Sequence, residues 1–78
     1  MDTAPDLVID ARNLSCPLPI IRAKRALGTV EIGSVIEVLT TDPGSLADFP
    51  AWTKMTGHLL LASRQEGDTY IFDIRRTK

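Results

Sequence analysis

The sequence lacks a second cysteine, so its single thiol, Cys16, has no partner within the chain. This absence excludes a disulfide-stabilised secreted fold and a thioredoxin-type oxidoreductase, which needs a resolving thiol. The chain also contains only one histidine. One cysteine and one histidine cannot complete a tetrahedral zinc site without carboxylates, and no pair of candidate ligands has metal-binding spacing. We therefore expect neither a metal site nor a cofactor.

Long apolar runs and a strong charge of either sign are also absent. No segment approaches the roughly 20 apolar residues that cross a bilayer, and the acidic N-terminus has no signal-peptide pattern. We therefore expect a cytoplasmic protein without membrane association. The net charge is −1 and the nine Lys and Arg are dispersed, which argues against strong nucleic-acid binding. The length of 78 residues and the hydrophobic fraction of 44% predict a monomer with one domain, 1–78, whose residues 1–5 are disordered.

The first half of the chain predicts a strand, a helix and a second strand. Residues Leu7–Arg12 alternate between apolar and polar, as in a half-buried strand, and Pro17–Leu27 has the periodicity of a helix. Gly28 is placed to end that helix in the left-handed conformation. Ser34–Thr41 is rich in β-branched residues and predicts a central strand. The side chains expected to face the core are Leu7, Ile9 and Ala11 in the strand and Ile20, Ala23 and Leu27 in the helix.

The segment after the second strand predicts a helix that is broken by proline. Asp42 suits an N-cap and is followed by a proline at the first helical position. Because Pro50 removes a backbone donor, we expect a short turn over Pro43–Ala47 and a second helical start at Pro50 that runs to about Thr56. The apolar stripe expected to face the core consists of Leu46, Phe49, Trp52 and Met55.

The remaining residues predict a hairpin. Gly57 is the next helix-capping candidate, and strands over Leu59–Arg64 and Thr69–Arg75 are joined by the turn signal Glu66–Asp68. The side chains expected on one face of the last strand are Tyr70, Phe72 and Ile74. The order βαβαββ favours an α+β fold, a two-layer sandwich with both helices on one face of a mixed four-stranded sheet. A ferredoxin-like arrangement is the alternative, and it would require the order βαββαβ.

The single cysteine lies between the first strand and the first helix, in the stretch Ser15–Pro19. A lone cysteine is most often a buried, inert side chain, but free N–H groups at a helix start favour a thiolate. Pro17 and Pro19 stiffen the loop and lack N–H groups, so Leu18 and Ile20 are the expected donors. We therefore predict a pKa for Cys16 below the ordinary thiol value.

One exposed thiolate without a resolving thiol can accept and release a single group. Sulfane sulfur suits this chemistry, because attack on a donor persulfide leaves a persulfide on Cys16 and consumes no other residue. A protease-like pair with His58 is not expected, because His58 follows the second helix at the far end of the fold.

The stretch Cys16–Pro19 resembles the Cys-Pro-x-Pro motif of the TusA/SirA-type sulfur-carrier family. Asn13 stands where this family usually has glycine, and asparagine tolerates the positive φ of such a turn. Leu18 stands where several members have glutamate. The other segments that resemble the family are Asp10–Leu14, Asp42-Pro43, Asp48–Pro50, Gly57–Leu60 and Ile71–Arg76.

The resemblance implies a sandwich like the C-terminal domain of translation initiation factor three, with strand order 1-2-4-3. It further implies that Cys16 receives sulfur as a persulfide from a cysteine desulfurase or a rhodanese-like donor. A downstream acceptor protein would serve tRNA thiolation, sulfur oxidation or the maturation of molybdenum-cofactor enzymes. Pro17 and Pro19 would support the motif. The chain would then act as a sulfurtransferase-type carrier within a relay.

Partners are expected to dock over the exposed side of the first helix, where Leu18, Arg22 and Arg25 lie near the thiol. The ordinary interpretation of this cluster is a solvated helix face. An alternative for the whole chain is a small protein- or RNA-binding regulatory module in which Cys16 is incidental.

Overall fold

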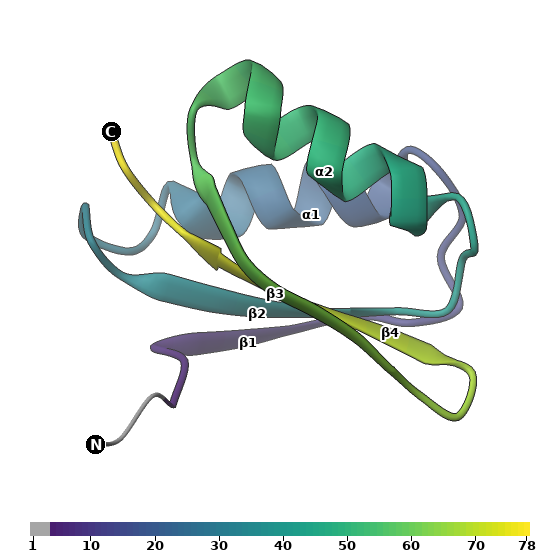
Figure 1. The fold of residues 1–78 in the computed structure, drawn as a ribbon. Helices are drawn as coiled ribbons and strands as arrows, with labels where there is room; N and C mark the ends of the chain where they lie inside the picture. Colours follow the sequence, from purple (N-terminus) through teal and green to yellow (C-terminus); the bar gives the residue numbers. More distant parts are fainter. Residues whose placement is uncertain (1–3) are drawn as a thin grey trace.

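The computed structural model describes residues 4–78 of the chain. The predicted order βαβαββ is confirmed, and the ferredoxin-like order is excluded (Figure 1). Disorder was predicted for residues 1–5, of which residues 1–3 lie outside the described part of the chain. No helix in the described part is both long and apolar enough to span a membrane. The elements are β1 (Leu7–Ala11), α1 (Leu18–Leu27), β2 (Val35–Thr40), α2 (Ser45–Thr56), β3 (Leu59–Glu66) and β4 (Thr69–Arg75).

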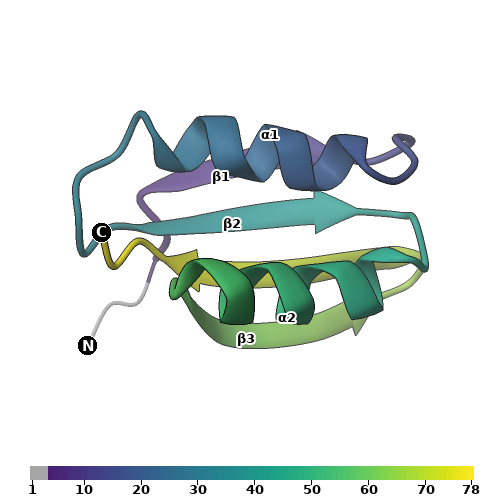
Figure 2. The same cartoon turned by 90° about the horizontal axis from the view of Figure 1, so that it is seen from above.

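The four strands form one mixed sheet in the order β1-β2-β4-β3. Strand β1 pairs with β2 in parallel, whereas β4 pairs antiparallel with both β2 and β3. Both helices cover the same face of this sheet, which Figure 2 shows from above. The two-layer arrangement expected from the strand alternation is therefore confirmed, together with the strand order implied by the family resemblance.

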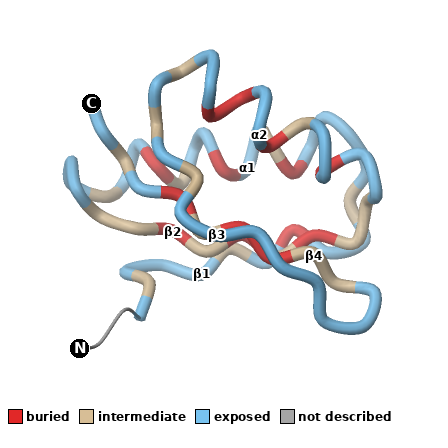
Figure 3. Tube along the Cα trace, in the orientation of Figure 1, coloured by how far each residue is buried: buried red, intermediate tan, exposed pale blue. Residues whose placement is uncertain are grey.

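The hydrophobic core lies between the helix layer and the sheet. Phe49 of α2 is fully buried and stacks on Phe72 of β4, with 4.6 Å between the ring centroids. Trp52 packs edge-on against Phe49 at 6.2 Å. Strand β3 contributes little, because most of its residues are exposed (Figure 3). The other buried members of the core are Ala11, Ala23, Leu27, Ile36, Val38 and Ile74.

Helix α1 ends differently from the prediction. Gly28 has a φ of −68°, so the expected left-handed cap is wrong. Instead, the Arg76 guanidinium donates hydrogen bonds to the backbone carbonyls of Leu27 and Val30. The Arg76 side chain thus holds the turn that follows α1, while the Gly28 N–H donates to the Lys24 carbonyl in a right-handed end of the helix.

Helix α2 runs without a break through Pro50, so the predicted interruption is wrong. Pro50 itself is exposed, whereas its neighbours Phe49 and Trp52 are buried. Because packing of an apolar face contributes more to helix stability in proteins than local propensity does, the burial of these two rings holds the helix together across the proline. The N-cap is Gly44 and not Asp42, whose Oδ1 accepts the Gly44 N–H at 3.2 Å.

The predicted apolar stripe of α2 is only half buried. Phe49 and Trp52 lie in the core, but the exposed fraction is 50% for Leu46 and 80% for Met55. With 3.6 residues per turn, each step of three residues turns the side chain by about 60° around the helix axis. A row of four such residues therefore spreads over about half of the helix surface, and only its middle pair can face the sheet.

The end of α2 and the following hairpin match the sequence pattern. Gly57 has a φ of 87°, and its N–H donates to the Thr53 carbonyl, so the predicted glycine cap is confirmed. The hairpin between β3 and β4 pairs Glu66 with Thr69 and turns through two residues, with Gly67 at a φ of 63°.

Candidate functional site

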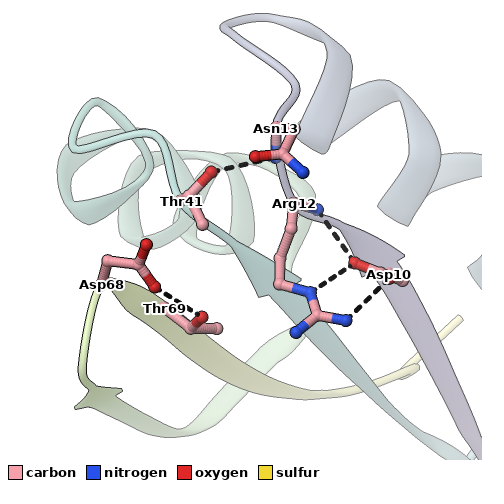
Figure 4. A network of polar contacts seen from close by, with 6 residues as sticks. All are labelled: Asp10, Arg12, Asn13, Thr41, Asp68 and Thr69. Atoms are coloured by element: carbon pink, nitrogen blue, oxygen red, sulfur yellow. Dashed lines mark hydrogen bonds and ion pairs between the residues drawn. The ribbon is translucent and has the colours of Figure 1, made fainter.

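The loop that carries Cys16 connects β1 to α1 and is tied to the loop between β2 and α2. Asn13 has a φ of 64°, as expected for an asparagine in a glycine-like turn. Its N–H donates to the Thr41 hydroxyl at 2.9 Å (Figure 4). The Cys16 N–H donates to Asp42 Oδ2, also at 2.9 Å. Because β1 and β2 are parallel, their carboxyl ends meet at one edge of the sheet and bring these two loops together.

An ion pair at the end of β1 lies directly before this loop. Arg12 Nε donates to Asp10 Oδ1 at 2.8 Å, and its Nη2 reaches the other carboxylate oxygen at 3.0 Å (Figure 4). The side-chain hydrogen bond from Arg12 lowers the pKa of Asp10 to about 2. Since both side chains are exposed, the pair orients the chain at the exit of β1 and adds little stability.

The two prolines of the motif have different places. Pro17 stands at the N-cap of α1, after a cis Cys16–Pro17 peptide bond, and is exposed. Pro19 lies in the first turn and is fully buried. Leu18 is exposed, and its N–H donates to the Ser15 carbonyl at 2.9 Å. The first turn is therefore anchored by Pro19 on the core side.

The thiol of Cys16 is exposed, but its pKa is raised and not lowered. The main cause is a hydrogen bond with the Asp48 carboxylate, followed by desolvation and by the charges of Asp48 and Asp42. The prediction of a lowered pKa is therefore wrong. It relied on the helix-start amides, but the Leu18 N–H is taken by a backbone carbonyl. The two nearby carboxylates and desolvation favour the protonated thiol.

A groove of about 310 Å³ opens beside Cys16 between α1 and α2. It is mostly apolar and has one acidic side chain, Asp48. The groove was not predicted from the sequence, although Asp48, Trp52 and Met55 stand at the i, i+4 and i+7 positions of one helix face. The residues that line it are Cys16, Pro17, Ile20, Asp48, Ala51, Trp52 and Met55.

The other residues singled out from the sequence lie elsewhere. Leu18, Arg22 and Arg25 are exposed on α1 and do not line the groove with Cys16. Their role as a partner surface stays a prediction. His58 follows the C-terminal end of α2, where its Nδ1 accepts the Thr77 N–H at 3.1 Å. His58 is not among the residues that line the groove, as expected from its place in the chain.

Comparison with known proteins identifies the family. Residues 7–76 match the family model described as sulfurtransferase TusA. The chain belongs to this family. Over 72 residues it is 46% identical to the sulfur carrier protein TusA of Allochromatium vinosum, which covers 92% of this chain and 95% of that protein. It is 45% identical over 71 residues to the putative sulfur carrier protein YrkI of Bacillus subtilis, with 91% and 95% covered.

The fold agrees with this TusA family membership. The crystal structure of a SirA-like protein from Desulfitobacterium hafniense superposes on the chain with a TM-score of 0.78 and 27% sequence identity. The match covers 92% of this chain and 99% of that protein. The resemblance first drawn from the Cys-Pro-x-Pro motif is thus confirmed for both family and fold.

Proposed function

We propose that this member of the TusA family carries sulfane sulfur as a persulfide on Cys16 and delivers it to an acceptor protein. The observation that carries the proposal is the exposure of the chain's only thiol in the loop before α1, within the family motif. An inert cysteine would be expected to lie in the core, and Cys16 does not. Pro17 and Pro19 support this loop. Pro19 does so because it lies in the first turn of α1 and is fully buried.

The chemistry requires only the one thiol. Cys16, as the thiolate, attacks the outer sulfur of a donor persulfide, so a bond from Sγ to that sulfur forms while the donor's S–S bond breaks. The electron pair leaves with the donor cysteine, which takes up a proton. The Cys16 sulfur is thereby oxidised to the persulfide level while the donor sulfur is reduced to a thiol. No outside oxidant and no resolving cysteine are needed.

The partners of this reaction are proteins on either side of the carrier. A cysteine desulfurase or a rhodanese-like protein would load Cys16, and a relay protein of tRNA thiolation, sulfur oxidation or cofactor maturation would unload it. We place this relay in the cytoplasm, where a single thiol stays reduced. The single domain 1–78 would act as a monomer, since transfer to a docked partner needs no second copy.

The test is sulfur loading of the wild type and of Cys16→Ser. Incubation with a cysteine desulfurase and cysteine should add the mass of one sulfur atom to the wild type, and a thiol reductant should remove it. Cys16→Ser should gain nothing while its circular-dichroism spectrum stays unchanged, because an exposed loop side chain contributes little packing. Failure of the wild type to gain sulfur from any desulfurase or rhodanese would favour the binding-module alternative.

A further inference from the structure

The groove beside Cys16 exposes more apolar surface than the fold requires. Met55 is 80% exposed although it stands next to buried residues of α2, and it lines the groove together with Ala51 and the edge of Trp52. The opposite wall comes from Pro17 and Ile20 of the first helix segment. Apolar side chains that converge beside a reactive group are typical of surfaces that another protein covers.

The charge of the groove is of one sign. Asp48 is its only charged lining residue, and none of the ion pairs found within residues 4–78 includes it. Asp42 lies close enough to act on the same thiol through its charge. The groove therefore offers apolar walls and an anionic group without a cation of its own chain, which complements an apolar side chain next to a cationic one.

We propose that this groove binds a segment of the sulfur-donating protein in which an apolar side chain lies beside a Lys or Arg, and that the cation pairs with Asp48. The inference rests on the carrier function proposed above and adds the chemistry of the partner. The apolar side chain contacts Met55 and Trp52, and the pairing brings the donor's persulfide next to Cys16.

Docking of this kind changes the reactivity of the thiol. In the free carrier the hydrogen bond to Asp48, desolvation and the nearby negative charges raise the pKa of Cys16, so a smaller fraction of the thiol is ionised at neutral pH. A donor cation that pairs with the Asp48 carboxylate replaces its hydrogen bond to the thiol, which is the main cause of the raised pKa. The pKa of Cys16 therefore falls when the donor is bound. The thiol proton then passes to water, and the thiolate attacks the outer sulfur of the donor persulfide as described above. The thiol of the free carrier is thus less reactive than the thiol of the docked carrier.

The test compares two reactions of the same thiol in wild type and Asp48→Asn. Alkylation by iodoacetamide at pH 7 needs no docking and should become about twofold faster or more in the variant, since loss of the Asp48 carboxylate lowers the pKa of Cys16 and raises its thiolate fraction. Loading by a cysteine desulfurase with cysteine should instead become at least about threefold slower and lose much of its salt dependence. Glu31→Gln, an equal charge change on an exposed residue outside the groove, should alter neither rate.

A second variant tests the apolar wall without touching the charge. Met55→Ala should slow desulfurase loading about threefold or more and leave the alkylation rate unchanged. The control is Leu46→Ala, since Leu46 is an exposed apolar residue of the same helix outside the groove, and it should change neither rate. The inference is overturned if Asp48→Asn is loaded as fast as the wild type or is not alkylated faster, or if Met55→Ala is loaded normally. A wild type that accepts no sulfur overturns the proposed function itself, and the inference fails with it.

Discussion

Neighbouring carboxylates, together with burial, raise the pKa of single side chains at two places in the described part of the chain. Beside Cys16, Asp48 and Asp42 raise the pKa of the thiol. On the sheet face away from the helices, Glu37 lies directly across from Asp73 in the β2–β4 pairing. Burial, together with the hydrogen bond to Asp73 and its charge, raises the pKa of Glu37 against the opposing effect of Arg64, which reaches both carboxylates at 3.4 Å.

Glu37→Gln should therefore stabilise the domain at neutral pH. A carboxyl whose folded pKa is raised contributes stability that is present below its unfolded pKa and is lost as the pH rises through the folded pKa. The variant removes that loss, so its free energy of unfolding at pH 7 should exceed that of the wild type by up to about 1 kcal/mol. Urea unfolding at pH 4 and pH 7 measures this, and the difference should nearly vanish at pH 4.

The matched control is Glu66→Gln, because Glu66 pairs with the same Arg64 but is exposed. It should not stabilise the domain at either pH. If Glu37→Gln proves less stable than the wild type at pH 7, attraction to Arg64 outweighs the repulsion and burial around Glu37.

These pKa shifts depend on contacts between residues far apart in the chain, so the sequence does not reveal them. Cys16 could be singled out as the candidate carrier thiol from its predicted place between a strand and a helix, and the structure places it there, exposed. Its raised pKa could not be predicted, because Asp48 reaches it from another helix and the sequence does not show that contact. The turn at Asn13 could be predicted, since its positive φ depends on the residue type itself.

At the scale of helices and strands, local patterns were most informative where local sterics decide the conformation. Gly57 ends α2 as expected, and all four strands lie within two residues of their predicted bounds. The prediction failed at Gly28 and Pro50, where distant contacts compete with the local preference. Arg76 donates hydrogen bonds to the carbonyls of Leu27 and Val30 at the end of α1, and core packing keeps α2 continuous.

Pro50→Ala should accordingly stabilise the chain. Alanine restores an N–H within a continuous helix and removes the clash of the proline ring with the preceding turn, an unfavourable term of about 3 kcal/mol in a helix interior. Part of the gain is offset because proline also restricts the unfolded chain by about 0.4–1 kcal/mol. We expect a net increase of roughly 2–2.6 kcal/mol in the free energy of unfolding, measured by urea denaturation.

Pro43→Ala is the control, since Pro43 is exposed in the turn before α2. It should leave stability unchanged or lower it slightly. A Pro50→Ala variant that is less stable than the wild type would mean that the ring of Pro50 contributes packing that outweighs the lost hydrogen bond.

For the whole molecule, one thin core joins two helices to one face of a sheet. Alternation and element order were sufficient to predict this layering. They could not predict the groove beside Cys16, because it depends on how far α1 and α2 separate above the sheet. The stack of Phe49 on Phe72 is the main aromatic contact between α2 and the sheet, so the wall of the groove depends on it.

Phe49→Ala should unfold much of the population. Truncation of a fully buried phenylalanine costs about 3–5 kcal/mol, which is a large share of the 5–15 kcal/mol that stabilises a typical domain. Leu46→Ala on the same helix should cost less than about 0.5 kcal/mol, because Leu46 is half exposed. Thermal unfolding followed by circular dichroism compares the two. Similar losses in both variants would contradict the core described above.

Persulfide carriage on Cys16 is tested by locating the transferred sulfur within the loaded chain. The chain would be loaded by a cysteine desulfurase with cysteine, digested without reductant, and mapped by tandem mass spectrometry. We expect one extra sulfur atom on the peptide that contains Cys16, lost after treatment with a thiol reductant. A loaded protein whose Cys16 peptide keeps its unmodified mass would show that Cys16 is not the carrier.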